Sequence, residues 1–176
     1  MKKNIEVKTN AKDKTGSAGK SGREISVFVD GSCKYNPGPG GYAFIIREGN
    51  QTVSASAGES HTTNNRMEMT AVLRALERIS LPSRIHIFTD SQYLINGMTR
   101  WVHTWLKNNW MSANKEPVKN KDLWLKLLQL SKPHSVAWHW VKGHSGHPEN
   151  EQCDRMAVAE AKKAGKNQGR GSGENQ

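Results

Sequence analysis

Two short apolar segments of this chain end in the same way, on an aspartate followed by a small residue. They are residues 26–31 (SVFVDG) and residues 86–91 (HIFTDS). Segments of this composition favour buried strands, so each carboxylate is expected at the edge of a sheet rather than on a solvated surface. If the two strands are neighbours, Asp30 and Asp90 converge, and like charges that close need a cation between them. The pattern therefore predicts a site for a hard metal ion.

The rest of the chain alternates between strand and helix patterns. Strands are expected over residues 25–30, 42–47, 52–58, 84–90 and 136–141, and helices over 65–80, from 91, twice within 101–131 and over 148–163. The first three strands, joined through the Gly/Pro-rich turn 36–41, are typical of an antiparallel meander. These elements predict an α/β fold with helices packed on a mixed five-stranded sheet.

The net charge of +10 is concentrated at the ends of the chain. Residues 24–161 carry 15 basic and 13 acidic side chains, so most of the excess lies outside them. Both ends are rich in Lys, Gly, Ser and Asn, so we expect disordered tails at 1–23 and 164–176 around one domain at 24–163. The tails are either solvated ends or a source of non-specific attraction to phosphate backbones.

Cysteine content and hydropathy favour a cytoplasmic protein without membrane association. Cys33 and Cys153 are the two cysteines of the chain and provide no disulfide framework. No apolar run approaches the ~18 residues of a membrane span. The N-terminus lacks the apolar core of a signal peptide, and its preference for Lys over Arg argues against a transit peptide.

Two further acidic residues, Glu68 and Asp154, lie in the apolar stripes of expected helices. A carboxylate in such a stripe costs stability unless it is compensated. The helix dipole would compensate it partly, and a bound cation would do so better. Together with Asp30 and Asp90 they form an oxygen-only donor set, which favours Mg²⁺ or Mn²⁺ over zinc.

The loop at residues 142–147 (KGHSGH) adds candidate proton-transfer chemistry. Its two glycines permit movement, and a mobile histidine such as His144 beside a metal and water suits proton transfer near neutral pH. A zinc site of His144, His147 and Cys153 fits none of the common ligand spacings. No Gly-x-Ser-x-Gly motif supports a serine hydrolase built on Ser32.

Five motifs, in order and with similar spacing, resemble those of bacterial type 1 ribonuclease H. They are FVDGSC with NPGPGGY (28–42), TTNNRME (62–68), TDSQY (89–93), WVKGH (140–144) and GHPENE ending at Cys153 and Asp154. The resemblance covers roughly residues 25–161. It implies a ribonuclease H-like fold with a basic helical protrusion. It also implies an endonuclease that hydrolyses the RNA strand of RNA–DNA hybrids by two-metal-ion cleavage, leaving 5′-phosphate and 3′-hydroxyl ends.

The resemblance assigns roles to the acidic residues and to the loop histidine. Asp30, Glu68, Asp90 and Asp154 match the catalytic carboxylates that bind two Mg²⁺ ions, for which Mn²⁺ can substitute. His144 matches a mobile catalytic histidine that helps to move protons or release product. Two such ions activate a water and stabilise the attacking and leaving oxygens of a phosphoryl displacement.

Choosing RNA over DNA requires recognition of the 2′-hydroxyl, and neutral amides match its capacity to donate and accept hydrogen bonds. Asn36, Asn64, Asn65 and Gln92 lie beside the acidic motifs and match family residues along the minor groove. Capping and turn formation are the alternative for Asn36 and Asn64. The other substrate-binding residues that the resemblance implies here are Cys33, and Thr63 with Asn120 at a phosphate of the DNA strand.

Residues 100–126 combine six basic side chains, two acidic ones and four tryptophans. This mixture indicates a nucleic-acid surface, although packing of a small helical protrusion accounts for most of the tryptophans. The resemblance places a hybrid-binding protrusion here, with Trp101, Trp105, Lys107 and Lys119 among its contacts. Bacterial relatives often carry adjacent basic residues where this chain has LKNN at 106–109. We therefore expect the N-terminal tail to supply part of the attraction.

Two other functions stay open at this level. Transposases, integrases and junction resolvases share the fold, but Asn64, Asn65 and Gln92 favour an RNA substrate over theirs. A hybrid-binding module without activity would not need four acids together with His144. We expect a monomeric, metal-dependent endoribonuclease.

Overall fold

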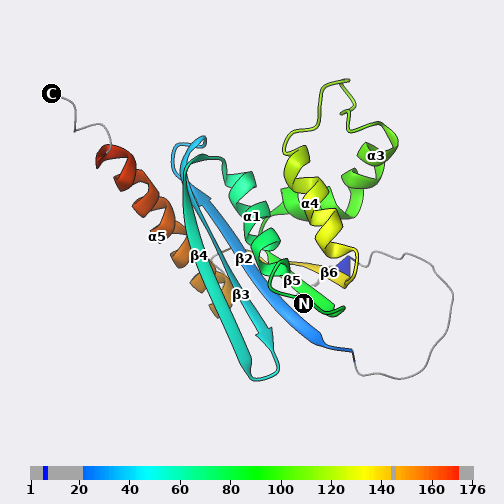
Figure 1. Ribbon diagram of the computed structural model, residues 1–176, viewed down its shortest axis with the longest axis horizontal. Helices are drawn as coiled ribbons and strands as arrows, with labels where there is room; N and C mark the ends of the chain where they lie inside the picture. The colour runs from blue at the N-terminus through cyan, green and yellow to red at the C-terminus, as the bar shows by residue number, and fades with distance from the viewer. Residues whose placement is uncertain (1–5, 8–21, 144–145, 171–176) are drawn as a thin grey trace.

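The centre of the molecule is one mixed sheet in a computed structural model that describes residues 6–7, 22–143 and 146–170 (Figure 1). Its strands lie in the order β1-β6-β5-β2-β3-β4. The strands are β1 (Glu6–Val7), β2 (Glu24–Cys33), β3 (Gly38–Glu48), β4 (Gln51–Thr62), β5 (Arg84–Thr89) and β6 (Ser135–Trp140). The helices are α1 (Asn64–Leu76), α2 (Gln92–Asn96), the π-helix η1 (Gly97–Trp101), α3 (Val102–Lys107), α4 (Lys121–Ser131) and α5 (Pro148–Arg170).

The two strands expected to end in aspartate are neighbours, although β2 continues past Asp30 to Cys33 and β5 ends at Thr89, just before Asp90. β2 pairs with β5 in parallel, and Phe28 lies opposite Phe88. Asp30 and Asp90 each follow that pair by two residues, so both reach the same edge of the sheet. On its other side β2 pairs antiparallel with β3, and β3 with β4, which confirms the predicted meander.

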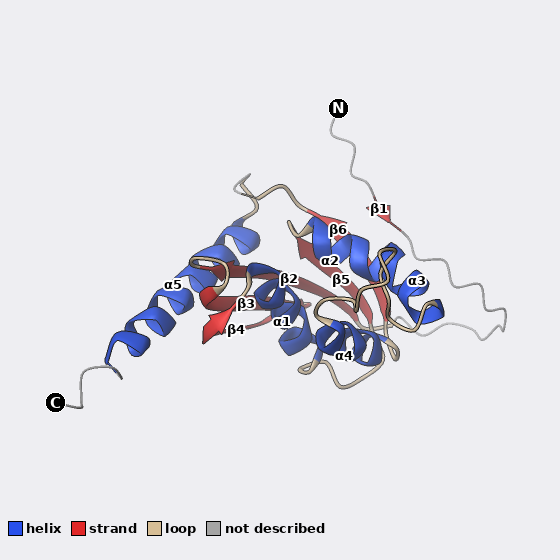
Figure 2. Ribbon diagram, turned by 90° about the horizontal axis from the view of Figure 1, so that it is seen from above, coloured by secondary structure: helices blue, strands red, loops and turns tan. Residues whose placement is uncertain are grey.

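Helices cover both faces of this sheet (Figure 2). Ile25, Val27 and Val29 of β2 belong to the main core, together with apolar residues of α1 and α4. On β3, Ala43 and Ile45 pack instead against α5. Because successive side chains of a strand point to opposite faces, α1 and α5 lie on opposite sides of the sheet. The acidic edge of β2 and β5 therefore has a helix on each side.

The predicted α/β fold is confirmed, and the five expected strands are β2 to β6. A sixth, β1, comes from the segment that we expected to be disordered: Glu6 lies opposite His139 and Val7 opposite Trp138. An edge strand such as β6 offers unpaired backbone groups to any extended segment that reaches it, which sequence composition does not reveal. The rest of residues 1–21 lies outside the described part of the chain.

The last helix is longer than expected. We placed its end near residue 163 and a flexible tail beyond it, whereas α5 continues to Arg170. Contacts with the sheet explain the difference: a Cβ at Gly58 of β4 would lie 3.1 Å from the Cβ of Ala164, and one at Gly165 would lie 3.3 Å from Pro39. The first added residues, Ala164 and Gly165, lie against β4 and β3, so contacts with the sheet continue the helix past residue 163 despite the low helix propensity of glycine.

The protrusion is built around aromatic side chains. α2, η1 and α3 follow one another without a break, and the π-helical turn begins at Gly97, where a Cβ would lie 2.1 Å from the Trp124 ring. Trp105 contacts Trp101, Trp110 and Trp124, with ring centroids 5.5–6.0 Å apart. The expectation that packing accounts for most of these tryptophans is confirmed for Trp110 and Trp124, which are buried.

Candidate functional site

Asp30 is the most deeply buried of the four carboxylates that the sequence singled out. It lies in β2, it is 7% exposed, and its Oδ1 accepts a hydrogen bond of 2.7 Å from the Gly31 N–H. The pKa of Asp30 is raised to about 8, first by burial and then by the negative charges of Asp90, Asp154 and Glu68, which together outweigh the opposing effect of that hydrogen bond. The fold thus brings the other three acids within electrostatic reach of Asp30.

Glu68 projects from α1 towards the same edge. Its side chain is buried, and burial raises its pKa to about 7. The hydroxyl of Ser91 donates to Oε2, and Asn64 Nδ2 donates to Oε1 over 2.8 Å. Both carboxylate oxygens are therefore held in place by neighbouring side chains.

The helix dipole, which could offset the cost of burying Glu68 and Asp154, acts only weakly on them in this fold. α1 has no acidic residue in its first turn, and the acids in the first turn of α5 are Glu149 and Glu151. Because the dipole acts mainly within the first turn, it contributes little at Glu68 and Asp154.

Two glycines allow the close approach that forms this edge. A Cβ at Gly31 would lie 2.3 Å from the backbone nitrogen of Glu68, so only glycine lets α1 lie directly against β2 there. A Cβ at Gly143 would lie 2.6 Å from Asp90 Oδ2. Asp90 also accepts a hydrogen bond of 3.2 Å at its backbone oxygen from Trp140 Nε1.

The acidic side chains at this edge do not form a ready metal site in the described residues. Within residues 6–7, 22–143 and 146–170, no group of three His, Cys, Asp or Glu side chains is arranged to hold a metal ion. His144, the predicted proton-transfer residue, lies outside the described residues. The loop beyond it returns to α5 through a hydrogen bond of 3.0 Å from Gly146 N to Glu151 Oε1.

The residues predicted to contact 2′-hydroxyl groups lie where the chain leaves β2, β4 and β5. Asn36 is exposed, and its Oδ1 accepts a hydrogen bond of 3.0 Å from Asn64 N at the start of α1. Asn65 is half-buried, whereas Gln92 is exposed at the start of α2. Cys33 is half-buried at the end of β2, with Sγ 3.3 Å from the Thr62 oxygen. Asn36 thus satisfies the first backbone N–H of α1, which corresponds to the capping alternative that we considered and not to turn formation.

Thr63 and Asn120, the residues predicted to bind phosphate, lie at the starts of α1 and α4. The basic and aromatic residues of the protrusion lie in or near α3 and α4. Thr63 caps α1, where Oγ1 accepts from Arg66 N over 3.4 Å, and Asn120 precedes α4. Lys107 and Lys119 are exposed. Trp101 is 38% exposed, and Trp105 is half-buried in the aromatic cluster.

Sequence reasoning treated Ser91 as the small residue after Asp90 and as the start of a short helix, without a role at the site. In the fold it is buried, it caps α2 by accepting a hydrogen bond of 3.2 Å from Leu94 N, and its own hydrogen goes to Glu68. The signal was present, since Ser after a strand and before a helix is a favoured N-cap. Its bond to Glu68 joins residues distant in sequence and could not be predicted.

If Glu68 is a metal ligand, replacing Ser91 with alanine is expected to reduce metal affinity or activity about 10- to 100-fold, the usual cost of losing a group that orients a ligand. Loss of the cap should also lower the free energy of unfolding by about 1 kcal/mol. Ser83→Ala is the matched control: Ser83 is equally buried but lies at the opposite end of β5, where its hydroxyl donates to the Leu81 oxygen. Equal activity of the two variants would show that Ser91 serves stability alone.

Cys33 and Cys153 are both free thiols, and burial raises the pKa of Cys153 to about 12. In the described part of the chain, no helix combines the length and apolar character that crossing a bilayer requires.

Comparison with known sequences shows which proteins this chain is similar to. The profile of the RNase H family matches residues 22–162. A protein of Bradyrhizobium sp. (strain ORS 278) named Ribonuclease H is 50% identical over 133 residues, covering 76% of this chain and 86% of that protein. A Ribonuclease H of Methylococcus capsulatus is 51% identical over 133 residues, with the same two coverages.

Comparison with solved structures agrees. A type 1 RNase H with the type 2 active-site motif (LC9-RNase H1) aligns with a TM-score of 0.74 and 31% identity, over 84% of this chain and 76% of that chain. LC11-RNase H1, solved in complex with an RNA/DNA hybrid, aligns with a TM-score of 0.60 and 21% identity, over 80% of this chain and 98% of that chain. The second likeness concerns the fold alone.

Proposed function

The chain belongs to the RNase H family, and from this premise we propose that it hydrolyses the RNA strand of RNA–DNA hybrids. The observation that carries the proposal is the meeting of four carboxylates at one edge of the sheet. Asp90, Asp154 and Glu68 all raise the pKa of Asp30, so their charges act on one small region. That region lies between α1 and α5, just beyond Phe28 and Phe88, where the pairing of β2 with β5 stops.

The donor set fits divalent hard cations. Asp30, Glu68, Asp90 and Asp154 offer only carboxylate oxygens, which suit Mg²⁺ or Mn²⁺. Two bound ions would supply activation of a water and stabilisation of charge on the attacking and leaving oxygens, with 5′-phosphate and 3′-hydroxyl ends as the products. Since no three ligands are arranged for an ion in the described residues, the carboxylates would have to reorient on binding.

The remaining residues of the site would orient groups and move protons. Ser91 and Asn64 hold both oxygens of Glu68, which limits the directions in which that carboxylate can face. His144 would carry protons or assist product release. We expect His144→Ala to slow turnover without abolishing metal binding.

Recognition of the hybrid would depend on sugar and backbone rather than on base sequence. Asn36, Asn64, Asn65 and Gln92 would read 2′-hydroxyl groups, with Cys33 beside them. The exposed lysines of the protrusion would attract phosphates, and Trp101 would offer a partly exposed ring. We expect a monomer that acts in the cytoplasm, with the basic N-terminal segment adding salt-dependent attraction.

The test of this function is a comparison of duplexes. Labelled RNA–DNA hybrid, RNA–RNA and DNA–DNA of one sequence are incubated with the protein in Mg²⁺ or in EDTA. We expect cleavage of the RNA strand of the hybrid alone, and only with Mg²⁺. Products should be substrates for an exonuclease that requires a 5′-phosphate. Cleavage of DNA–DNA, or binding of the hybrid without cleavage in Mg²⁺, would contradict the proposal.

A further inference from the structure

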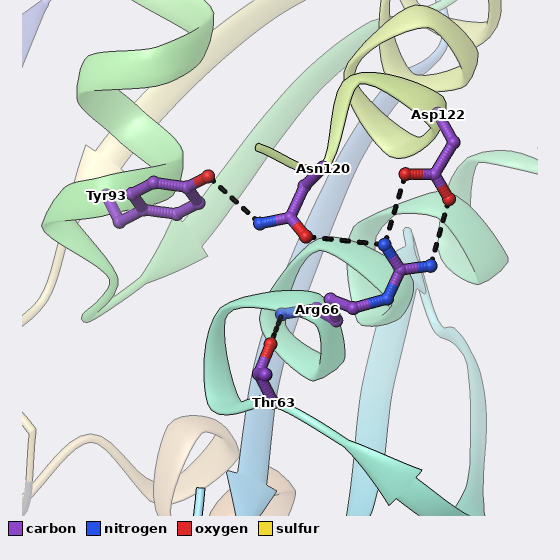
Figure 3. Close-up of polar contacts among 5 residues, drawn as sticks. All are labelled: Thr63, Arg66, Tyr93, Asn120 and Asp122. Carbon is purple, nitrogen blue, oxygen red and sulfur yellow. Dashed lines mark hydrogen bonds and ion pairs between the residues drawn. The ribbon is translucent and has the colours of Figure 1, made fainter. Parts of the chain in front are cut away.

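Arg66 makes contacts that the proposed chemistry does not use. It lies in α1, and its guanidinium reaches across to α4 (Figure 3). Nη1 and Nη2 donate to the two carboxylate oxygens of Asp122 over 3.1 and 2.9 Å, and Nη1 also donates to Asn120 Oδ1 over 3.3 Å. The Arg66 side chain is thus hydrogen-bonded to both Asp122 and Asn120 at the start of α4.

Asn120 is held from two sides. Its Nδ2 donates to the hydroxyl oxygen of Tyr93 over 3.1 Å, while Oδ1 accepts from Arg66 (Figure 3). Its backbone adopts the left-handed conformation, with φ 59° and ψ 26°, and its side chain makes no capping bond to α4. Asparagine tolerates this conformation better than most residues. The carboxamide is therefore committed to its neighbours rather than to capping.

The guanidinium decides which way this amide points. A guanidinium carries five donors and no acceptor, so only the oxygen of a carboxamide can face it. With Oδ1 towards Arg66, the Nδ2 group must lie on the opposite side, where one hydrogen meets Tyr93. The second hydrogen of Nδ2 then has a defined direction.

Arg66 also contacts the other residue predicted to bind phosphate. Its backbone N–H donates to Thr63 Oγ1 over 3.4 Å, so one residue connects Thr63 on α1 with Asn120 before α4 (Figure 3). We propose that Arg66 is a positioning residue for the DNA strand: it fixes the Asn120 carboxamide so that the N–H not bonded to Tyr93 faces, together with Thr63, one phosphate. This inference rests on the proposed function and adds a residue to its recognition of the hybrid.

Asp122 makes the contribution of Arg66 geometric rather than electrostatic. The bidentate pair neutralises the guanidinium, and it fixes the plane from which Nη1 reaches Asn120. Stability is a weak reason for the pair, because Asp122 is 56% exposed and exposed pairs contribute only about 0–1 kcal/mol. Positioning and simple charge attraction therefore make opposite predictions for Asp122.

The experiment measures binding of full-length protein to a labelled RNA–DNA hybrid in EDTA by fluorescence anisotropy, and KM and kcat in Mg²⁺. Asp122→Asn removes a negative charge near the expected phosphate, so charge attraction alone would tighten binding. We expect instead about threefold to tenfold weaker binding and a raised KM with little change in kcat, as for the loss of one ordinary hydrogen bond. Arg66→Lys keeps the charge and loses the fork, and it should weaken binding by about the same factor.

The matched controls lie on the same helix. Arg74 pairs with Glu77 over 2.9 Å near the end of α1, so Arg74→Lys and Glu77→Gln change the same kinds of groups away from Asn120. Both should bind the hybrid like the parent protein. Thermal unfolding of all variants shows whether a change in binding reflects loss of fold.

A double-mutant cycle gives the decisive result. If Arg66 acts through Asn120, then Arg66→Lys has no further effect on binding in an Asn120→Ala protein. Additive losses, or tighter binding by Asp122→Asn, would overturn the inference while the parent protein still cuts the hybrid. A parent protein that does not cut the hybrid would instead overturn the proposed function.

Discussion

Asp30→Asn should abolish hydrolysis of the hybrid in Mg²⁺ and, in EDTA at pH 8, make the folded protein more stable. The activity falls because a neutral amide replaces the carboxylate at the centre of the proposed ligand set. The loss should exceed the roughly 10- to 100-fold typical of residues that only orient a ligand. The stability rises because the substitution removes a buried carboxyl that is repelled by Asp90, Asp154 and Glu68.

Initial rates and thermal unfolding on the same preparations check both parts. Glu77→Gln, which removes one charge from an exposed ion pair at the far end of α1, is the control and should change neither quantity appreciably. An Asp30→Asn protein that retains more than about a tenth of the parent activity would remove Asp30 from the catalytic set, since even orienting residues cost that much.

The stability of the metal-free protein should fall as pH rises from about 4 to 8. The pKa of Asp30 is raised from 3.8 to about 8 in the fold, and that of Glu68 from 4.5 to about 7. Between the unfolded and folded pKa values the folded state binds more protons than the unfolded state, so raising the pH favours unfolding. The stabilisation is complete below about pH 4 and is lost as pH passes through the folded pKa values.

The magnitude should be several kcal/mol across this range, and each kcal/mol lowers the Tm of a domain of this size by about 2–4 °C. Unfolding curves in EDTA from pH 5 to 8 measure it. Mg²⁺ should restore stability chiefly at the upper end, where the carboxylates it binds are ionised. The Asp30→Asn protein should show a shallower slope and a smaller response to Mg²⁺. A parent protein whose stability rises steadily over this range would contradict the assignment of buried, mutually repelling acids.

Much of the fold could be predicted from local patterns. Apolar runs ending on Asp30 and Asp90 identified two strands, and Pro148 marked a helix start where it occurs. These predictions succeed because a strand or helix must show one apolar face, and that periodicity is written in consecutive residues. The helix end placed at residue 80 because of Pro82 was wrong, since α1 ends at Leu76. The motifs added the likeness to a family, which the comparisons confirm.

The failures share a cause. β1 depends on the free edge of β6, and the last turns of α5 depend on contacts with β3 and β4. Neither partner is near in sequence, so composition predicted tails at both ends. Local propensity is a weak guide where a distant surface provides the stabilising contact.

What the chain determined by itself is the chemistry available: four carboxylates at the ends of strands or in apolar helix stripes, amides beside them, and basic residues among tryptophans. Only the tertiary structure decided how these groups meet. It placed β2 beside β5 and allowed α1 to lie directly against β2 at Gly31. It also formed the hydrogen bonds from Ser91 to Glu68 and from Arg66 to Asn120. The physical reason is that strand order and side-chain hydrogen bonds between distant residues result from packing the whole core, and no local period of the sequence records them.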